Sequence, residues 1–396
     1  MSVTDSTKPV GIEVSLAMAE AVKLAKAEVI AAYPITPQTH IVEHLSDLVA
    51  NGELDAEYVP VESEQSAMSA CIGSSAAGAR TYTATSSQGL MLMAEMVFIA
   101  PMLRLPIVMA VANRAVSGPI NIWNDHSDIM IIRDCGWIQI FAENGQEATD
   151  MSIISFKIAE DPRVMMPLIL NIDGFTLSHF IEPIVFPEED KIKQYLPPYE
   201  TSHKLDITKP MSLGALGPPE VYSEARKAMD DALLASKAGV IRGFEEFAEI
   251  FGRKYNLVES YRAEDAETII VAMGSISETA MVAVDEMRAA GEKVGLVRIR
   301  LWRPFPVEEF LAAVEGAKYL AVVDRHFTPG FPEGPVATEV RALMYNNDNR
   351  PKIANFVLGL GGRDVPRNHF KHIVEQVKEL GTAGSQSRYE MVGVQQ

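Results

Sequence analysis

The sequence predicts an α/β fold in which parallel strands alternate with helices. Short runs of β-branched and apolar residues recur along the chain, and longer segments with apolar residues at helical spacing separate them. The 396 residues are 47% apolar and 22% charged, which is the balance of a globular protein. A chain of this length has room for two or three domains.

The first part of the chain alternates regularly between the two kinds of element. Apolar runs predict strands at 29–32, 58–61, 80–85, 107–112 and 166–172. Helical spacing predicts helices at 12–27, 41–50, 64–77, 91–100 and 149–159. The second of these helices ends at Asn51-Gly52, and the third is rich in Ala and Ser, which suits close packing on a sheet. This order favours a parallel sheet covered by helices on both faces.

The composition changes after the last of these strands. Residues 183–219 are rich in proline and lack periodicity, so we expect a long irregular arm that crosses the surface toward another subunit. A helix from about 220 to 251 follows, with a weak point at Gly239, and 252–265 is a polar joint. The predicted domains are therefore 1–252, with its arm and helix at about 183–252, then 265–380, and a loosely held tail at 381–396.

The second domain is predicted to be α/β as well. Its strands are expected at 268–273, 294–299 and 319–323, and its helices at 277–290, 307–314 and 336–345.

Charge and cysteine content limit the classes of partner and site. The formal net charge of −18 argues against binding nucleic acid or an anionic membrane surface. No apolar run could span a membrane and the polar N-terminus lacks a signal-peptide pattern, so we expect a cytoplasmic protein. Cys71 and Cys135 lie far apart, which predicts two core thiols and no four-cysteine cluster or zinc site in this chain.

The most informative stretch, Tyr33-Pro-Ile-Thr-Pro37, follows directly on the strand at 29–32. Each proline fixes its own φ and pushes the preceding residue toward extended geometry, so Ile35 and Thr36 are tightly held. Ligands of parallel sheets bind beyond the carboxyl ends of the strands. A fixed threonine hydroxyl at this position therefore predicts contact with a ligand.

An acidic residue and a serine-rich turn follow two other strands. Glu64 begins the helix after the strand at 58–61, where its carboxylate could face a heterocycle nitrogen. Alternatively, Glu62 and Glu64 are first-turn acids that interact with the helix dipole. The turn Ser86-Ser87-Gln88-Gly89 could approach a ligand through its backbone N–H groups, or it could be an ordinary helix cap.

Arg114 follows the strand at 107–112, and its planar guanidinium suits a carboxylate. The alternative is a structural ion pair with an Asp or Glu. Thr36, Glu64 and Arg114 thus follow three separate strands of one predicted sheet. Their convergence favours a binding site over three independent structural roles.

Three further patterns are weaker. His126, in the polar loop 121–128, could serve in acid–base chemistry, although turn chemistry also explains such a loop. His40 and His44 are spaced i, i+4 but lack a convincing third ligand, so we do not expect a metal site there. Gly-Leu-Gly-Gly at 359–362 resembles a phosphate loop only weakly, because no Lys-Ser/Thr follows.

These motifs closely resemble those of the α subunits of pyruvate:ferredoxin oxidoreductases (pyruvate synthases), within the thiamine-dependent 2-oxoacid:ferredoxin oxidoreductases. The resemblance covers roughly residues 10–375, in order along both domains. The matching stretches are Tyr33-Pro-Ile-Thr-Pro37, Ser63-Glu64, Ser87-Gln-Gly-Leu-Met-Leu-Met93, Asn113-Arg-Ala115, Asn124-Asp-His126, Asp173-Gly-Phe175, Ala272-Met-Gly-Ser275 and Arg300-Leu-Trp-Arg-Pro-Phe305.

The resemblance implies a domain that binds the aminopyrimidine of thiamine diphosphate, followed by a transketolase-C-like α/β domain. It implies that Glu64 hydrogen-bonds the pyrimidine nitrogen and so promotes formation of the reactive ylid. Thr36 and Arg114 would hold the carboxylate of the 2-oxoacid. The residues expected around the cofactor are Pro34, Ile35, Glu64, Ser87 and Gln88.

The resemblance also implies partner subunits. The family carries its diphosphate and Mg²⁺ site on a Gly-Asp-Gly signature, which this chain lacks, so a β subunit would complete the site. The [4Fe–4S] clusters would lie on partner subunits, with γ and δ subunits completing the complex. Ferredoxin, usually acidic, would dock away from this acidic chain.

The implied reaction is oxidative decarboxylation of pyruvate with coenzyme A, giving acetyl-CoA, CO₂ and reduced ferredoxin, or the reverse synthesis. Thr36 and the stretch Val116-Ser-Gly-Pro-Ile-Asn-Ile-Trp-Asn124 favour pyruvate. The alternatives are a relative that acts on oxalate, 2-oxoglutarate or branched-chain oxoacids, and a non-catalytic scaffold subunit of the same fold.

Overall fold

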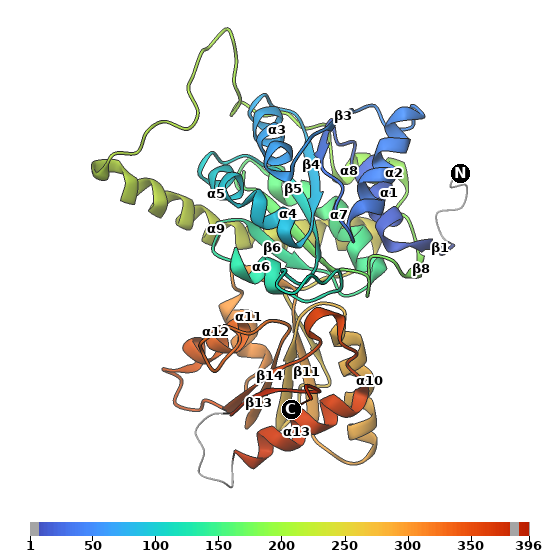
Figure 1. The fold of residues 1–396 in the computed structure, drawn as a ribbon, viewed down its shortest axis with the longest axis vertical. Coiled ribbons are helices and arrows are strands. Elements are labelled where there is room, and N and C mark those ends of the chain that lie inside the picture. Colours follow the sequence, from blue (N-terminus) through green and yellow to red (C-terminus); the bar gives the residue numbers. More distant parts are fainter. Residues whose placement is uncertain (1–7, 381–387, 396) are drawn as a thin grey trace.

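The computed structural model describes residues 8–380 and 388–395 and shows two lobes, each built on a mostly parallel sheet (Figure 1). The first lobe is drawn in blue to green, and the second in orange to red. The predicted α/β class with parallel sheets is thereby confirmed.

The first lobe is centred on a sheet with the strand order β12-β6-β7-β5-β4-β2-β3. All its pairs are parallel except β12 with β6. Every residue of β4, β5, β6 and β7 is buried, as expected for central parallel strands. The strands are β2 (Val29–Ala32), β3 (Glu57–Pro60), β4 (Thr81–Thr85), β5 (Val108–Asn113), β6 (Ile138–Phe141), β7 (Leu168–Asp173) and β12 (Leu301–Arg303).

Helices cover this sheet, and an antiparallel ribbon of β1 (Val10–Glu13) and β8 (Ile181–Ile184) lies beside it. The predicted helix at 12–27 is shorter than expected because β1 occupies its first residues. The predicted helix at 91–100 is divided between two shorter helices, α4 and α5. The helices are α1 (Val14–Leu24), α2 (Thr39–Ala50), α3 (Glu64–Ala76), α4 (Ser87–Leu92), α5 (Ala94–Met102), α6 (Ser127–Ile131) and α7 (Gly145–Glu160).

The predicted irregular arm is only partly irregular. The ribbon strand β8 and the helix α8 (Glu189–Tyr195) take up its beginning, and residues 196–218 are without helix or strand. The helix α9 (Pro219–Phe251) then runs unbroken through Gly239. A Cβ at Gly239 would lie 2.3 Å from Val164 Cγ2, so glycine lets the helix approach the lobe closely. The end of the arm and the first turns of α9 project away from the lobe (Figure 1).

Although α9 has 33 residues, neither it nor any other described helix combines the length and apolar character needed to cross a membrane.

The second lobe has the strand order β15-β14-β13-β10-β11-β9. Strand β9 lies inside the predicted polar joint and β15 inside the predicted tail, so this sheet extends beyond 265–380 on both sides; the tail residues 381–387 and 396 lie outside the described residues. The strands are β9 (Val258–Tyr261), β10 (Thr268–Ala272), β11 (Val294–Ile299), β13 (Tyr319–Asp324), β14 (Lys352–Val357) and β15 (Arg388–Met391). The helices are α10 (Ile276–Ala289), α11 (Val307–Ala313), α12 (Pro335–Met344), α13 (Arg367–Glu379) and a 3₁₀ turn, η1 (Leu360–Gly362).

The two lobes are joined through a shared strand and a shared core. Strand β12 follows β11 of the second lobe in sequence but pairs with β6 of the first, with Leu301 opposite Ile140. Trp302 is fully buried between them, in one apolar cluster with Val111 of the first sheet and Val271 of the second. The apolar core is therefore continuous from one sheet to the other.

Candidate active site

The predicted site residues gather at the carboxyl ends of four neighbouring strands. In the order β5-β4-β2-β3, these strands are followed by Arg114, Ser87, Thr36 and Glu64. The strands are parallel, so their carboxyl ends share one edge of the sheet. This edge is where open α/β sheets bind their ligands.

Arg114 and Thr36 are in direct contact. Arg114 Nη1 donates to the Thr36 carbonyl at 2.9 Å, and Nε donates to the Asn121 carbonyl at 2.8 Å. Within the described part of the chain Nη2 has no hydrogen-bond partner, and Thr36 is exposed. Burial lowers the pKa of Arg114 while Asp128 acts in the opposite direction, and a guanidinium stays charged at neutral pH. The guanidinium is therefore held through Nη1 and Nε, and its Nη2 is left for a ligand.

Glu64 and Glu62 differ sharply in their surroundings. Glu62 is exposed and accepts a hydrogen bond from Ser66 Oγ at 2.5 Å, whereas Glu64 is only 6% exposed. The Glu64 carboxylate makes no hydrogen bond or ion pair with the other described residues. Buried carboxylates are rare without a partner because desolvating them is costly. This buried, partnerless acid favours a ligand over the helix dipole as the reason for its position.

Gly89 provides the space for that carboxylate. A Cβ at Gly89 would lie 2.6 Å from Glu64 Oε1 and 2.6 Å from Thr85 Oγ1. Real Cβ atoms do not approach other atoms so closely, so only glycine fits here. Three buried polar atoms on the same turn also lack a partner among the described residues, namely Thr85 Oγ1, Ser86 Oγ and Gln88 Nε2. The turn therefore offers several unused donors and acceptors near Glu64.

Asp128 ties two of these strand ends together. Its Oδ2 accepts from the backbone N–H groups of Ser87 and Arg114, both at 3.0 Å. Its Oδ1 accepts from Asn113 Nδ2 at 3.1 Å. Burial raises the pKa of Asp128 to about 7, although these hydrogen bonds oppose the shift. The sequence indicated only a polar loop at 121–128 and did not single out this carboxylate.

The second lobe holds the loop that carries Arg114. Asn121, whose carbonyl binds Arg114, donates its side-chain N–H to the Gly361 carbonyl at 3.1 Å. A Cβ at Gly362 would lie 2.3 Å from Trp123 Cβ, and Gly361 and Gly362 both have positive φ. The Gly-Leu-Gly-Gly run is therefore a close contact between lobes, which accounts for its glycines without a phosphate.

His126 is part of a buried ionic cluster between the lobes. Its Nε2 lies 2.8 Å from Asp173 Oδ1, while Asp173 Oδ2 accepts from Ser275 Oγ at 2.5 Å and from Arg325 Nη1 at 3.0 Å. Burial alone would raise the pKa of Asp173, but Arg325, His126 and Ser275 outweigh it and hold the pKa well below its usual range. The predicted acid–base candidate thus takes part in fixing the lobes to each other.

The remaining candidates are placed apart. His40 binds Glu13 and His44 binds Glu20, so the two histidines do not share a ligand. Cys71 and Cys135 are both buried and free, and burial raises the pKa of each thiol to about 12. Inert core thiols of this kind are what the sequence predicted.

Two family patterns match the chain in order. The pattern described as "Pyruvate flavodoxin/ferredoxin oxidoreductase, thiamine diP-bdg" matches residues 20–241. The chain belongs to the pyruvate:ferredoxin oxidoreductase family. The pattern described as "Pyruvate:ferredoxin oxidoreductase core domain II" matches residues 266–370 of this family member. The predicted resemblance is confirmed.

Relatives in the family match nearly the whole chain. "Pyruvate synthase subunit PorA" of Methanocaldococcus jannaschii is 49% identical, over 92% of this chain and 93% of the relative. The subunit of the same description from Pyrococcus furiosus is 48% identical, over 91% of each. "Ketoisovalerate oxidoreductase subunit VorA" of Pyrococcus abyssi is 43% identical, over 94% of each.

Two solved structures share the fold. A 2-oxoglutarate:ferredoxin oxidoreductase from Magnetococcus marinus, solved with 2-oxoglutarate, coenzyme A and succinyl-CoA, has a TM-score of 0.72 at 21% identity. The match covers 94% of this chain and 65% of that one. A split-gene transketolase has a TM-score of 0.53 at 11% identity, over 93% of this chain and 98% of that one. At these identities the likeness shows the fold alone.

Proposed function

We propose that this chain is the subunit of a pyruvate:ferredoxin oxidoreductase that binds the aminopyrimidine end of thiamine diphosphate and the carboxylate of pyruvate. The observation that carries the proposal is the buried, partnerless Glu64 on the same sheet edge as the open Arg114–Thr36 pair. The reaction is pyruvate, coenzyme A and two oxidised ferredoxins to acetyl-CoA, CO₂, a proton and two reduced ferredoxins, or its reverse.

The residues around Glu64 fit an aminopyrimidine. Its carboxylate can bind a ring nitrogen, and Gly89 leaves the space that this contact needs. Ser87 and Gln88 line the neighbouring turn, where Gln88 Nε2 is buried without a partner, and Pro34 and Ile35 border it after β2. When bound, thiamine diphosphate supplies the carbon nucleophile and the electron sink for decarboxylation. A carboxylate oxygen of Glu64 would share a proton with the ring nitrogen through a hydrogen bond.

Arg114 and Thr36 would bind the substrate carboxylate. Arg114 Nη2 would supply a charge-assisted N–H, and the Thr36 hydroxyl a second contact, since the Thr36 carbonyl is bound to the same guanidinium. Two such contacts would orient a small 2-oxoacid in the site. The descriptions of the pyruvate synthase relatives support pyruvate, and the 43% identical ketoisovalerate relative makes a branched-chain oxoacid the second candidate. Turnover of the two acids under identical conditions distinguishes them.

Partner subunits would supply the rest of the machinery. We place the Mg²⁺–diphosphate site on a β subunit and the [4Fe–4S] clusters on partner chains, together with γ and δ subunits, because this sequence lacks the motifs for both groups. The projecting arm exposes large apolar side chains, including Ile207 at 99% and Leu216 at 92%, which suits docking against a partner chain. Ferredoxin would dock elsewhere because this chain is strongly acidic.

The decisive experiment compares Glu64→Gln with Glu62→Gln in the reconstituted complex. The first change removes the proposed carboxylate, so we expect turnover to fall by about 10²–10⁴-fold, the usual range for positioned acid–base groups. Glu62→Gln removes the exposed carboxylate two residues earlier, and we expect turnover to stay near the wild-type value. Near-normal turnover of Glu64→Gln would refute the role proposed for Glu64.

A further inference from the structure

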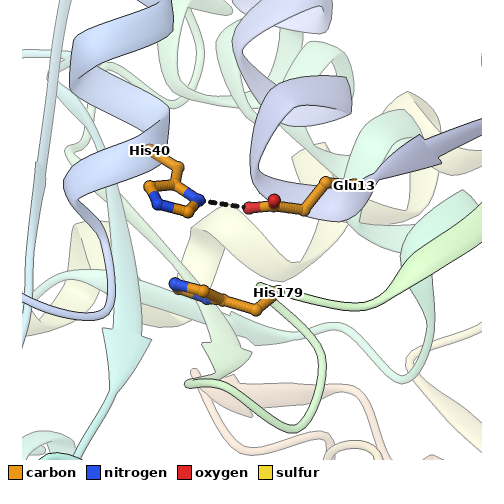
Figure 2. Close-up of side chains that lie close together, drawn as sticks. All are labelled: Glu13, His40 and His179. Carbon is orange, nitrogen blue, oxygen red and sulfur yellow. Dashed lines mark hydrogen bonds and ion pairs between the residues drawn. The ribbon is translucent and has the colours of Figure 1, made fainter.

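Three side chains of metal-binding types, one Glu and two His, meet beside the start of α2 (Figure 2). Glu13 ends β1, His40 is the second residue of α2, and His179 precedes β8. One donor atom from each lies within 4.8 Å of the other two, and His40 Nδ1 is 2.6 Å from Glu13 Oε1. The two imidazole rings face each other at 4.5 Å between centroids, with Glu13 beside His40.

The backbone holds two of these residues in place. Val14 N–H donates to the Phe180 carbonyl and Ser15 N–H to the Ser178 carbonyl, both at 3.0 Å. The ribbon register sets Glu13 opposite Ile181, two residues after His179. The third residue, His40, lies in the first turn of α2, which packs on α1. The cluster therefore comes from three anchored segments rather than from mobile surface side chains.

The donor set suits a transition-metal ion. Imidazole nitrogen and carboxylate oxygen are common ligands of Zn²⁺ and its neighbours. Ser178 Oγ lies 2.8 Å from His179 Nδ1, and with Nδ1–H donating to it, Nε2 of His179 is free to coordinate.

The distances require only a small adjustment. Donors about 2.1 Å from a tetrahedral ion lie about 3.4 Å from each other. The three donor atoms lie within 4.8 Å of one another, so no pair needs to approach by more than about 1.4 Å, which side-chain torsions can provide.

We propose that Glu13, His40 and His179 bind a divalent transition-metal ion of the Zn²⁺ class, with water in the fourth position. The ion would lie between His40 Nδ1 and Glu13 Oε1, and because protons compete with the metal for imidazole nitrogens and carboxylates, binding weakens as the pH falls. It clamps the N-terminal ribbon to the first turn of α2, directly after Thr36 and Pro37. The site is independent of the assignment of Glu64 and Arg114.

The test is a titration of the full-length, chelator-treated chain with Co²⁺ alone, followed by competition with Zn²⁺. We expect visible absorption bands that saturate at one equivalent, disappear when Zn²⁺ is added and weaken at lower pH. His40→Gln, His179→Gln and Glu13→Gln should each weaken Co²⁺ binding at least about tenfold.

His44→Gln is the matched control, because His44 lies one turn further along α2 and binds Glu20 at 2.9 Å. We expect it to bind Co²⁺ as the wild type does. The proposal is overturned if the wild-type chain gives no saturable bands, or if His44→Gln weakens binding as much as the other variants. The three ligand variants test the site separately, so one variant that fails to fold leaves two others to decide.

Discussion

At the scale of single residues, sequence position alone could not separate Glu62 from Glu64, because both are acids at the start of one helix. Folding buries one and exposes the other. The sequence did predict which strand ends carry Thr36, Glu64 and Arg114, because parallel strands place their carboxyl ends on one edge. It missed Asp128, whose backbone partners on Ser87 and Arg114 lie 41 and 14 residues away.

Arg114 is the residue whose replacement best tests substrate binding. Arg114→Ala removes a charge-assisted contact of about 1.5–3 kcal/mol, so we expect the KM for pyruvate to rise about 10- to 150-fold. The Kd for thiamine diphosphate should stay within about twofold of the wild-type value, since the guanidinium is assigned to the substrate. Steady-state kinetics and cofactor titration of the complex measure the two.

Arg163→Ala serves as the control for that variant, because Arg163 is exposed and, within residues 8–380 and 388–395, pairs only with Asp161 and not with any site residue. We expect normal kinetics. An equal loss of pyruvate and cofactor binding in Arg114→Ala would instead identify a structural arginine.

At the scale of elements, the sequence predicted best the apolar strands that alternate with helices. The predicted strands 29–32 and 294–299 coincide with β2 and β11. The strands β1, β6, β8, β9, β12 and β15 were missed, and each has only three or four residues and depends on a neighbouring strand for its pairing. The six-residue strand β14 was missed as well. The unbroken α9 shows the opposite effect, where packing on Val164 keeps Gly239 inside a helix.

The turn between β4 and α4 can be tested with two glycine substitutions. Gly89→Ala would place a methyl group 2.6 Å from Glu64 Oε1, and such overpacking costs about 1–3 kcal/mol. We expect lower stability and a marked loss of thiamine diphosphate affinity, because Glu64 must move. Thermal unfolding and cofactor titration measure both.

Gly73→Ala is the matched substitution in α3, where an added Cβ meets nothing within 4 Å. We expect unchanged cofactor affinity and a gain of about 0.5–1 kcal/mol in stability, because alanine restricts the unfolded chain and favours the helix. Equal cofactor affinity in the two variants would mean that Gly89 does not control the position of Glu64.

The connection from β13 to α12 predicts a pH dependence. Asp324 accepts from the backbone N–H groups of Val336 and Ala337 at the start of α12, and burial raises its pKa to about 7. The unfolded value is about 3.9, so the folded state binds the proton more tightly between these values. The stability contributed by Asp324 therefore falls as the pH rises from about 4 to about 7.

Asp324→Asn cannot ionise and should remove this dependence. We expect the free energy of unfolding of the wild-type chain, relative to the variant, to decrease across that pH range and then level off. Urea unfolding at several pH values measures the difference. A difference that is constant with pH would contradict the raised pKa of Asp324.

At the scale of the whole molecule, the buried Asp173 cluster fastens one lobe to the other. Asp173→Asn leaves Arg325 without its carboxylate, and breaking a buried ion pair costs about 3–5 kcal/mol. We expect the two lobes to unfold in separate transitions in calorimetry, where the wild type gives closer or merged transitions. Asp265→Asn, which breaks an exposed pair with Arg288, should change stability by no more than about 1 kcal/mol.

The division into two α/β units was foreseeable from the repeated alternation of strand and helix. Their connection was not, because β12 has three residues, and its partner β6 lies far earlier in the sequence. No local sequence pattern near Trp302 indicates that strand β12 joins the sheet of the first lobe. The motifs that resemble the family at 272–275 and 173–175 turn out to touch each other through Ser275 and Asp173.

The borrowed strand β12 limits how this protein can be divided. A fragment ending at 252 would lack Leu301–Arg303 and leave β6, whose four residues are all buried in the full chain, as an open sheet edge. Bare apolar edges recruit strands from other molecules, so such a fragment would aggregate. Any permutation or gene fission that preserves solubility must therefore keep residues 301–303 with the first lobe.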